Sequence, residues 1–170
     1  MKRTLKNSEN SGPKKESPLT KALDDLNNTI KSNTEKSRII AEEHFSRIKK
    51  FNMDFNLLAN SLIRPIMAEI IKELKSSGHN ARFSNKNEEA NFRMRTIGDN
   101  YISYYFHIKN VPPFILLFRG NSPIQKVFIE FHKLNEKPTV HQFDLKDISR
   151  DLIDNQLTNE IKKINVQIKS

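Results

Sequence analysis

The sequence predicts an α+β fold: a long N-terminal helix with coiled-coil character, followed by an antiparallel β-meander of four to six strands packed by a helix on each side of it in sequence. Two observations predict this fold. Residues 90–133 contain four short runs of strand composition separated by turn residues. Residues 17–62 and 153–168 instead carry apolar side chains at spacings of three and four, the period of an α-helix. We therefore predict a basic arm over 1–16, a helical segment over 17–62 and an α+β domain over 63–170.

Composition limits the classes of protein to which the chain can belong. Its 170 residues are 36% hydrophobic and 29% charged, which leaves room for one domain and an appendage. There is no cysteine, so disulfides, thiolate metal sites and cysteine nucleophiles are excluded. No run approaches the roughly 18–20 apolar residues that span a bilayer. These features predict a cytoplasmic protein.

The chain has a formal net charge of +9. A basic balance favours anionic partners such as nucleic acid. The abundance of Asn, Lys and Ile offers a second explanation, the coding bias of an AT-rich genome. Residues 1–16 are polar and basic, and we expect them to be disordered. They are either an anion-binding arm or, as the sequence favours, an ordinary solvated tail.

The first helix is predicted to begin at Ser17 and Pro18, because serine is a good N-cap and proline suits the first helical position. Its apolar stripe is narrow, which indicates a partner helix more than a sheet. Two polar positions in the stripe, Asn33 and Ser37, leave a break between two helices as an alternative. The predicted oligomerisation residues are Leu19, Leu23, Leu26, Ile30, Ile40, Ile48, Phe51 and Phe55. The competing interpretation is that the helix folds back onto its own sheet.

The next segment has a broader apolar face. Pro65 interrupts the helix because it lacks an amide donor and clashes with the preceding turn. Residues 66–74 suit a helix that lies on a sheet, and Gly78 stands at the usual position after its last turn. His79–Ser84 is a candidate for a first short strand, and Asn85–Glu89 reads as a polar turn.

Four runs then predict the sheet. They are Ala90–Ile97, Tyr101–Ile108, Phe114–Arg119 and Lys126–Lys133. Apolar and polar residues alternate in the first, second and fourth runs, which places one set on a core and the other toward solvent. The third run is apolar on both faces, so it is expected to be central and covered on each side. The short loops predict antiparallel pairing of consecutive strands.

The chain is predicted to end with one more strand and a helix. Thr139–Leu145 is the last candidate strand, and Asp147 or Ser149 is a suitable cap for the helix that follows. The apolar positions of that helix are Ile153, Leu157, Ile161, Ile164 and Ile168.

The sequence predicts no catalytic residue, no cofactor and no metal site. The five histidines form neither His-x3-His nor His-Glu-x-x-His, and four glycines are too few for a glycine-built phosphate cradle. A nuclease-like pair of Glu130 and Lys133 is excluded because the odd spacing sends the two side chains to opposite faces of a strand. We therefore predict a protein that is not an enzyme.

One group of residues resembles a nucleic-acid-binding surface. Aromatic rings for stacking beside cations for phosphate are what single-stranded nucleic acid binding uses. The members of this group are Arg93, Arg95, Tyr101, Tyr105 and Arg119. The same residues are also ordinary cross-strand pairs with good strand propensity.

The leading functional prediction is a non-enzymatic protein-interaction module, a homo-oligomer that self-associates through its N-terminal helix. The alternative is a nucleic-acid-binding protein that uses the basic and aromatic sheet face together with the basic arm. Neither prediction identifies a partner other than a second copy of the chain or a nucleic acid.

Overall fold

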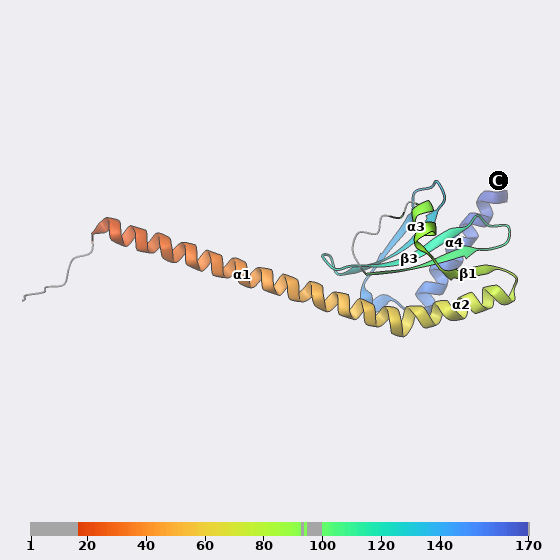
Figure 1. Cartoon of the computed structure of the whole chain (residues 1–170), viewed down its shortest axis with the longest axis horizontal. Coiled ribbons are helices and arrows are strands. Elements are labelled where there is room, and N and C mark those ends of the chain that lie inside the picture. The colour runs from red at the N-terminus through yellow and green to blue at the C-terminus, as the bar shows by residue number, and fades with distance from the viewer. Residues whose placement is uncertain (1–16, 93, 95–99, 170) are drawn as a thin grey trace, which may run out of the picture. The chain divides into compact units, whose positions relative to one another are not determined.

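The computed structural model describes residues 17–92, 94 and 100–169, together with the side chains up to residue 164. The basic arm predicted over 1–16 lies outside these residues, as does the side chain of Ile168. The fold is α+β, as predicted, with a long N-terminal helical region, a five-stranded antiparallel sheet and a C-terminal helix (Figure 1). Contacts divide the chain into two units, residues 1–44 and 45–170.

Helix α1 spans Pro18–Leu58 without a break. It begins where the sequence predicts, because the Thr20 amide donates to the Ser17 hydroxyl over 3.2 Å. Asn33 and Ser37 do not interrupt it, so the alternative of two shorter helices is wrong. No helix in the described part of the chain is long and apolar enough to cross a membrane.

A single π-helical turn, η1 (Ala59–Ile63), separates α1 from helix α2 (Arg64–Ser76). Pro65 lies in the first turn of α2, where its missing amide costs no intrahelical hydrogen bond. The predicted interruption near this proline takes the form of the π-helical turn that precedes it. Gly78 follows the end of α2 with φ of 77°, a left-handed conformation that glycine adopts at little cost.

The five strands pair in chain order, and every pair is antiparallel. They are β1 (Asn80–Phe83), β2 (Tyr101–His107), β3 (Phe114–Asn121), β4 (Lys126–Lys133) and β5 (Thr139–Phe143). The predicted meander is confirmed, and the bounds of β4 match its prediction. The apolar run of β3 forms the middle strand and is buried from Phe114 to Phe118.

One face of the sheet forms the main core, which we call the core face. It carries the even-numbered residues of β2 and β3 and the odd-numbered residues of β4. The C-terminal turns of α1, helix α2 and the final helix, α4 (Arg150–Lys169), pack against it. The largest fully buried side chains of this core include Phe55, Tyr104, Phe106, Phe114, Phe118 and Phe131.

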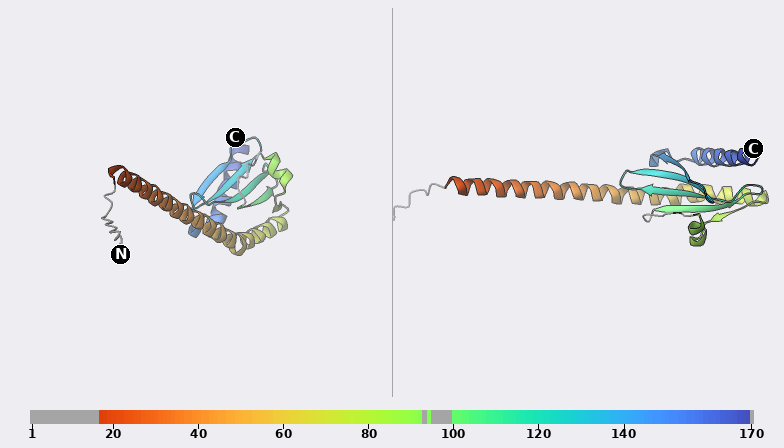
Figure 2. Two further views of the ribbon diagram at one scale, coloured as in Figure 1. Left: turned by 60° about the vertical axis from the view of Figure 1, so that its left-hand side comes forward. Right: turned by 90° about the horizontal axis from the view of Figure 1, so that it is seen from above.

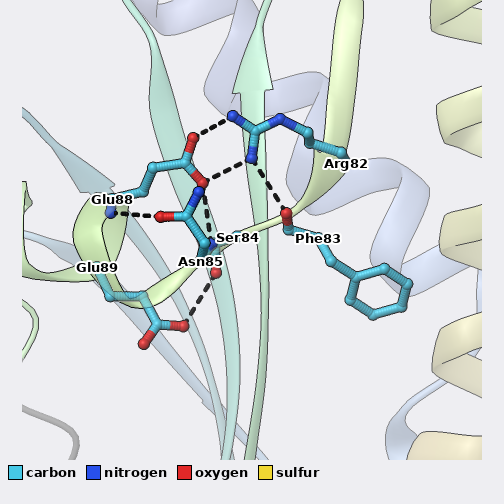
Figure 3. Close-up of polar contacts among 6 residues, drawn as sticks. All are labelled: Arg82, Phe83, Ser84, Asn85, Glu88 and Glu89. Carbon is cyan, nitrogen blue, oxygen red and sulfur yellow. Dashed lines mark hydrogen bonds and ion pairs between the residues drawn. The ribbon is translucent and has the colours of Figure 1, made fainter.

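The predicted strand over Ala90–Ile97 is wrong where the structure describes it. Residues Lys86–Asn91 form a short helix, α3, and residues 93 and 95–99 lie outside the described part of the chain. Asn85 caps α3: its side-chain oxygen accepts from the Glu88 amide over 3.0 Å, and the Glu88 carboxylate accepts from the Asn85 amide over 3.0 Å (Figure 3). This reciprocal capping box starts a helix where a polar turn was predicted over Asn85–Glu89, and the helix runs on into the first two residues of the predicted strand.

Helix α3 lies on the opposite side of the sheet from α4 (Figure 2). We call the side that α3 covers the second face. It carries the odd-numbered residues of β2 and β3 and the even-numbered residues of β4. Ile115 and Leu117 are buried on it, outside the main core. The predicted cover on both sides of β3 is therefore confirmed.

Helix α4 begins as predicted after Ser149, whose hydroxyl accepts from the Leu152 amide over 3.2 Å. A short 3-10 turn, Leu145–Asp147, precedes it. Lys133 Nζ of β4 lies 2.7 Å from Glu160 Oε1 of α4, and Glu160 is buried. This ion pair gives the buried carboxylate a charged partner beside the core face.

Gly120 of β3 lies directly under the ring of Phe55. A Cβ atom added at Gly120 would lie 2.9 Å from Phe55 Cγ, closer than real Cβ contacts come. We expect Gly120→Ala to lower the free energy of unfolding by about 1–3 kcal/mol, because overpacking forces a well-packed ring to move. Chemical denaturation followed by circular dichroism checks the value. A Gly120→Ala protein as stable as the wild type would show that the ring moves aside freely.

Candidate functional site

The exposed face of α1 carries the first candidate surface, which we call the apolar stripe. Spacings of four and three place its members on one side of the helix. Each is between 51% and 70% exposed. Its members are Leu19, Leu23, Leu26, Ile30 and Ile40. Five large aliphatic side chains in one row on a helix therefore meet water within the first unit.

The other side of the same helix is polar. Arg38 donates to Glu35 over 2.7 Å and to Glu42 over 2.9 Å, and all three side chains are exposed. The hydrogen bond from Arg38 lowers the pKa of Glu35 below its ordinary value. The charged groups on this side of α1 are therefore paired with one another while they remain in water.

Three predicted oligomerisation residues lie elsewhere. Phe51 and Phe55 are buried in the core of the second unit, and Ile48 is half-buried. The helical period continues from the apolar stripe into these residues, so the sequence could not separate them from it. Because Phe51 and Phe55 pack in their own domain, they are not available to a partner helix.

On the second face of the sheet, a half-buried cluster surrounds Glu89 of α3. Its carboxylate accepts from the hydroxyls of Ser84 (3.0 Å), Ser103 (2.5 Å) and Tyr101 (3.1 Å). The hydroxyl oxygens of Ser84 and Ser103 also lie within hydrogen-bond distance of each other, so one of the two hydroxyls can donate to the other instead of to Glu89. Next to this cluster Arg82 forms an ion pair with Glu88 (Figure 3).

A second cluster on the same face joins β3 and β4. Arg119 donates to Glu130 Oε1 through Nε (2.9 Å) and Nη2 (2.5 Å), and His132 Nε2 lies 2.9 Å from Glu130 Oε2. Burial alone would raise the pKa of Glu130, but the hydrogen bonds from His132 and Arg119 outweigh it and lower the pKa below its ordinary value. Glu130 is therefore an ionised acceptor, and His132 carries a proton on Nε2.

His132 lines a pocket of about 450 Å³. The pocket is formed by Phe92, Glu130, His132, Lys133, Asn135, Glu136, Lys137 and Pro138. A carboxylate that holds an imidazole in one orientation is a common way to prepare that ring to exchange a proton or a hydrogen bond. Sequence reasoning missed the pair, although residues two apart on a strand share a face.

Among the described residues, no group of three His, Asp or Glu side chains could hold a metal ion.

The predicted nucleic-acid residues have partners inside the protein where the structure describes them. Tyr101 donates to Glu89, and Arg119 binds Glu130 and lies 4.7 Å from the centre of the Phe128 ring. The guanidinium of Arg82 lies 5.0 Å from the centre of the Tyr105 ring.

Arg93 and Arg95, the other two members of the predicted nucleic-acid surface, lie outside the described residues. The expectation that this face of the sheet meets solvent is wrong for Ser103, Glu130 and His132, which are buried. Ser103 hydrogen-bonds to Glu89 of α3, and Glu130 binds Arg119 and His132, which the alternation of residues could not show.

The chain matches no protein-family model, no curated protein and no solved structure.

Proposed function

We propose that this chain is a non-enzymatic interaction module that self-associates through the apolar stripe of α1. The observation that supports the proposal is the exposure of five aliphatic side chains along one row of a continuous helix. From Leu19 to Ile40 the row extends about 30 Å at 1.5 Å per residue. Burying each of these side chains is worth about 1.5–3 kcal/mol, enough for several together to favour association.

The form of the stripe favours a helix as its partner. The row is one residue wide and repeats every 3.5 residues on average, which is the pattern that two supercoiled helices bury between them. A sheet or a globular surface would instead require the broader apolar face that α2 carries. The charged residues Glu35, Arg38 and Glu42 lie away from the stripe, so pairing leaves their ion pairs in water.

Replacing Leu26 or Ile30 by aspartate should convert the oligomer to a monomer, because a carboxylate in the pairing seam loses its hydration. Sedimentation equilibrium at tens of micromolar measures the change. Asn28→Asp is the matched control: it adds the same charge to the same helix on the side opposite the stripe, and it should leave association unchanged. A wild-type chain that is already monomeric at this concentration would refute the proposed function.

A further inference from the structure

The proposal in this subsection rests on the proposed function and specifies the partner more closely. We propose that two copies of the chain pair through α1 as a parallel, in-register coiled coil in which Asn33 faces Asn33 of the second copy. The argument uses the order of apolar and polar residues along the stripe and the charges beside it.

The spacings assign the stripe to the two core positions of a seven-residue repeat. Leu23, Ile30, Ser37 and His44 occupy the first core position, a. Leu19, Leu26, Asn33 and Ile40 occupy the second, d. The seam therefore has apolar layers at both ends of residues 19–40 and two adjacent polar layers, Asn33 and Ser37, between them.

A parallel, in-register pair matches every layer with itself. The Asn33 side chain carries both donors and an acceptor, so two of them can hydrogen-bond across the seam. Ser37 meets the hydroxyl of its copy in the next layer, and each aliphatic residue meets an aliphatic residue. A single buried asparagine at position a is a known means by which a coiled coil sets its register and its number of helices, and we assign Asn33 the same role at the other core position, d.

The residues that flank the seam are compatible with this arrangement. In a parallel pair, Lys36 of one copy lies beside Ala41 of the other, and Thr29 lies beside Thr34. No two like charges are brought together. The charged residues of this part of α1 lie mostly on its outer side, where Arg38 is already paired with Glu35 and Glu42.

Antiparallel registers match the layers less well, because position a then meets position d. The register that pairs Ile30 with Leu26 places Asn33 against Leu23. The register that pairs Ile30 with Asn33 places the same amide against Ile30. In both registers the buried amide loses its partner, which is costly for a polar group.

Two antiparallel registers avoid that mismatch but have other costs. The register that pairs Asn33 with Ser37 places Lys36 beside Lys36 of the second copy, and like charges repel. A short overlap that pairs Leu19 with Ile30 is apolar throughout, but it leaves Ile40 in water. The parallel register is the one that buries the whole stripe and satisfies its polar layers.

Disulfide trapping tests the orientation cleanly, because the chain has no cysteine of its own. Leu19→Cys and Ile40→Cys are made separately and oxidised at equilibrium in a glutathione buffer. A disulfide needs Cα atoms within roughly 7 Å, so each variant should form a disulfide-linked dimer with itself only if the helices are parallel and in register. Both residues lie at least ten positions from their own copies in every antiparallel register above.

Mixtures of two variants are the control for the opposite orientation, because position a meets position d in antiparallel helices. Disulfides that form between Leu23→Cys and Ile40→Cys, or between Leu19→Cys and Ile30→Cys, but not within any single variant, would overturn the parallel arrangement. Sedimentation equilibrium of the reduced variants separates the two proposals. A monomer refutes self-association itself, whereas an oligomer without the self-disulfides, or one larger than a dimer, refutes only the parallel pair.

The role of Asn33 is tested by adding Asn33→Leu to the same cysteine variants. With Asn33→Leu, the antiparallel register that pairs Ile30 with residue 33 no longer buries an amide without a partner, so the mixed disulfide between Leu23→Cys and Ile40→Cys should appear beside the self-disulfides. If Asn33→Leu leaves the self-disulfides as the sole products, Asn33 does not set the register.

Discussion

Replacing Phe55 by alanine should lower the free energy of unfolding by about 3–5 kcal/mol, the usual cost of a large cavity at a buried aromatic residue. The side chain is completely buried, and its ring lies on the backbone of Gly120 in the middle strand. Denaturant titration followed by circular dichroism measures the change. Met53→Ala is the matched control, because Met53 is exposed on the same helix and its replacement should cost little.

The same variant distinguishes the core from the association surface. If Phe55 packs only in its own domain, Phe55→Ala should leave the association constant unchanged under conditions in which the protein stays folded. A variant that keeps wild-type stability but loses self-association would place Phe55 in the interface with a second copy.

Glu130→Gln should destabilise the protein by about 3–5 kcal/mol at neutral pH, the usual cost of removing one member of a buried ion pair. Glu130 is buried and accepts hydrogen bonds from both Arg119 and His132. The neutral amide leaves the Arg119 charge without a counter-ion on the second face. Glu136→Gln is the control, because Glu136 is exposed and lies 3.8 Å from Lys133.

The cost of Glu130→Gln should depend on pH. The pKa of Glu130 is lower in the folded protein than its ordinary value of 4.5, so ionisation of this carboxyl favours folding. That contribution is fully present above pH 4.5 and is lost as the pH falls through the lowered folded pKa. The stability difference between wild type and Glu130→Gln should therefore shrink in acid, as denaturation at a series of pH values would show. A difference that is constant from pH 7 to the acid limit would contradict the ionised pair.

Much of the sheet could be predicted from the sequence because local patterns decide it. Phe114–Phe118 is apolar on both faces, which requires a central strand, and short loops require antiparallel neighbours. The error over residues 90–97 arose because Ala90 and Phe92 alternate with polar residues. The stronger signal was the Asn85–Glu88 capping box, since satisfied amides at a helix start outweigh a short alternation.

The candidate surfaces were less accessible to sequence reasoning. Apolar residues at spacings of three and four give the same sequence pattern whether a partner helix or the protein's own sheet covers them. The sequence therefore could not show that Phe55 is buried and Ile30 exposed. Likewise, alternation placed Glu130 and His132 on one face, but their burial depends on cover that comes from other segments of the chain.

The order of the strands has a consequence for folding kinetics. Each strand pairs with the strand next to it in the chain, and α2 contacts β1, which follows it directly. The average separation in sequence between residues that pair in the sheet is therefore small, so little loop-closure entropy opposes each strand pairing. The domain should therefore refold faster than all-β proteins of similar length, whose strands pair over long loops.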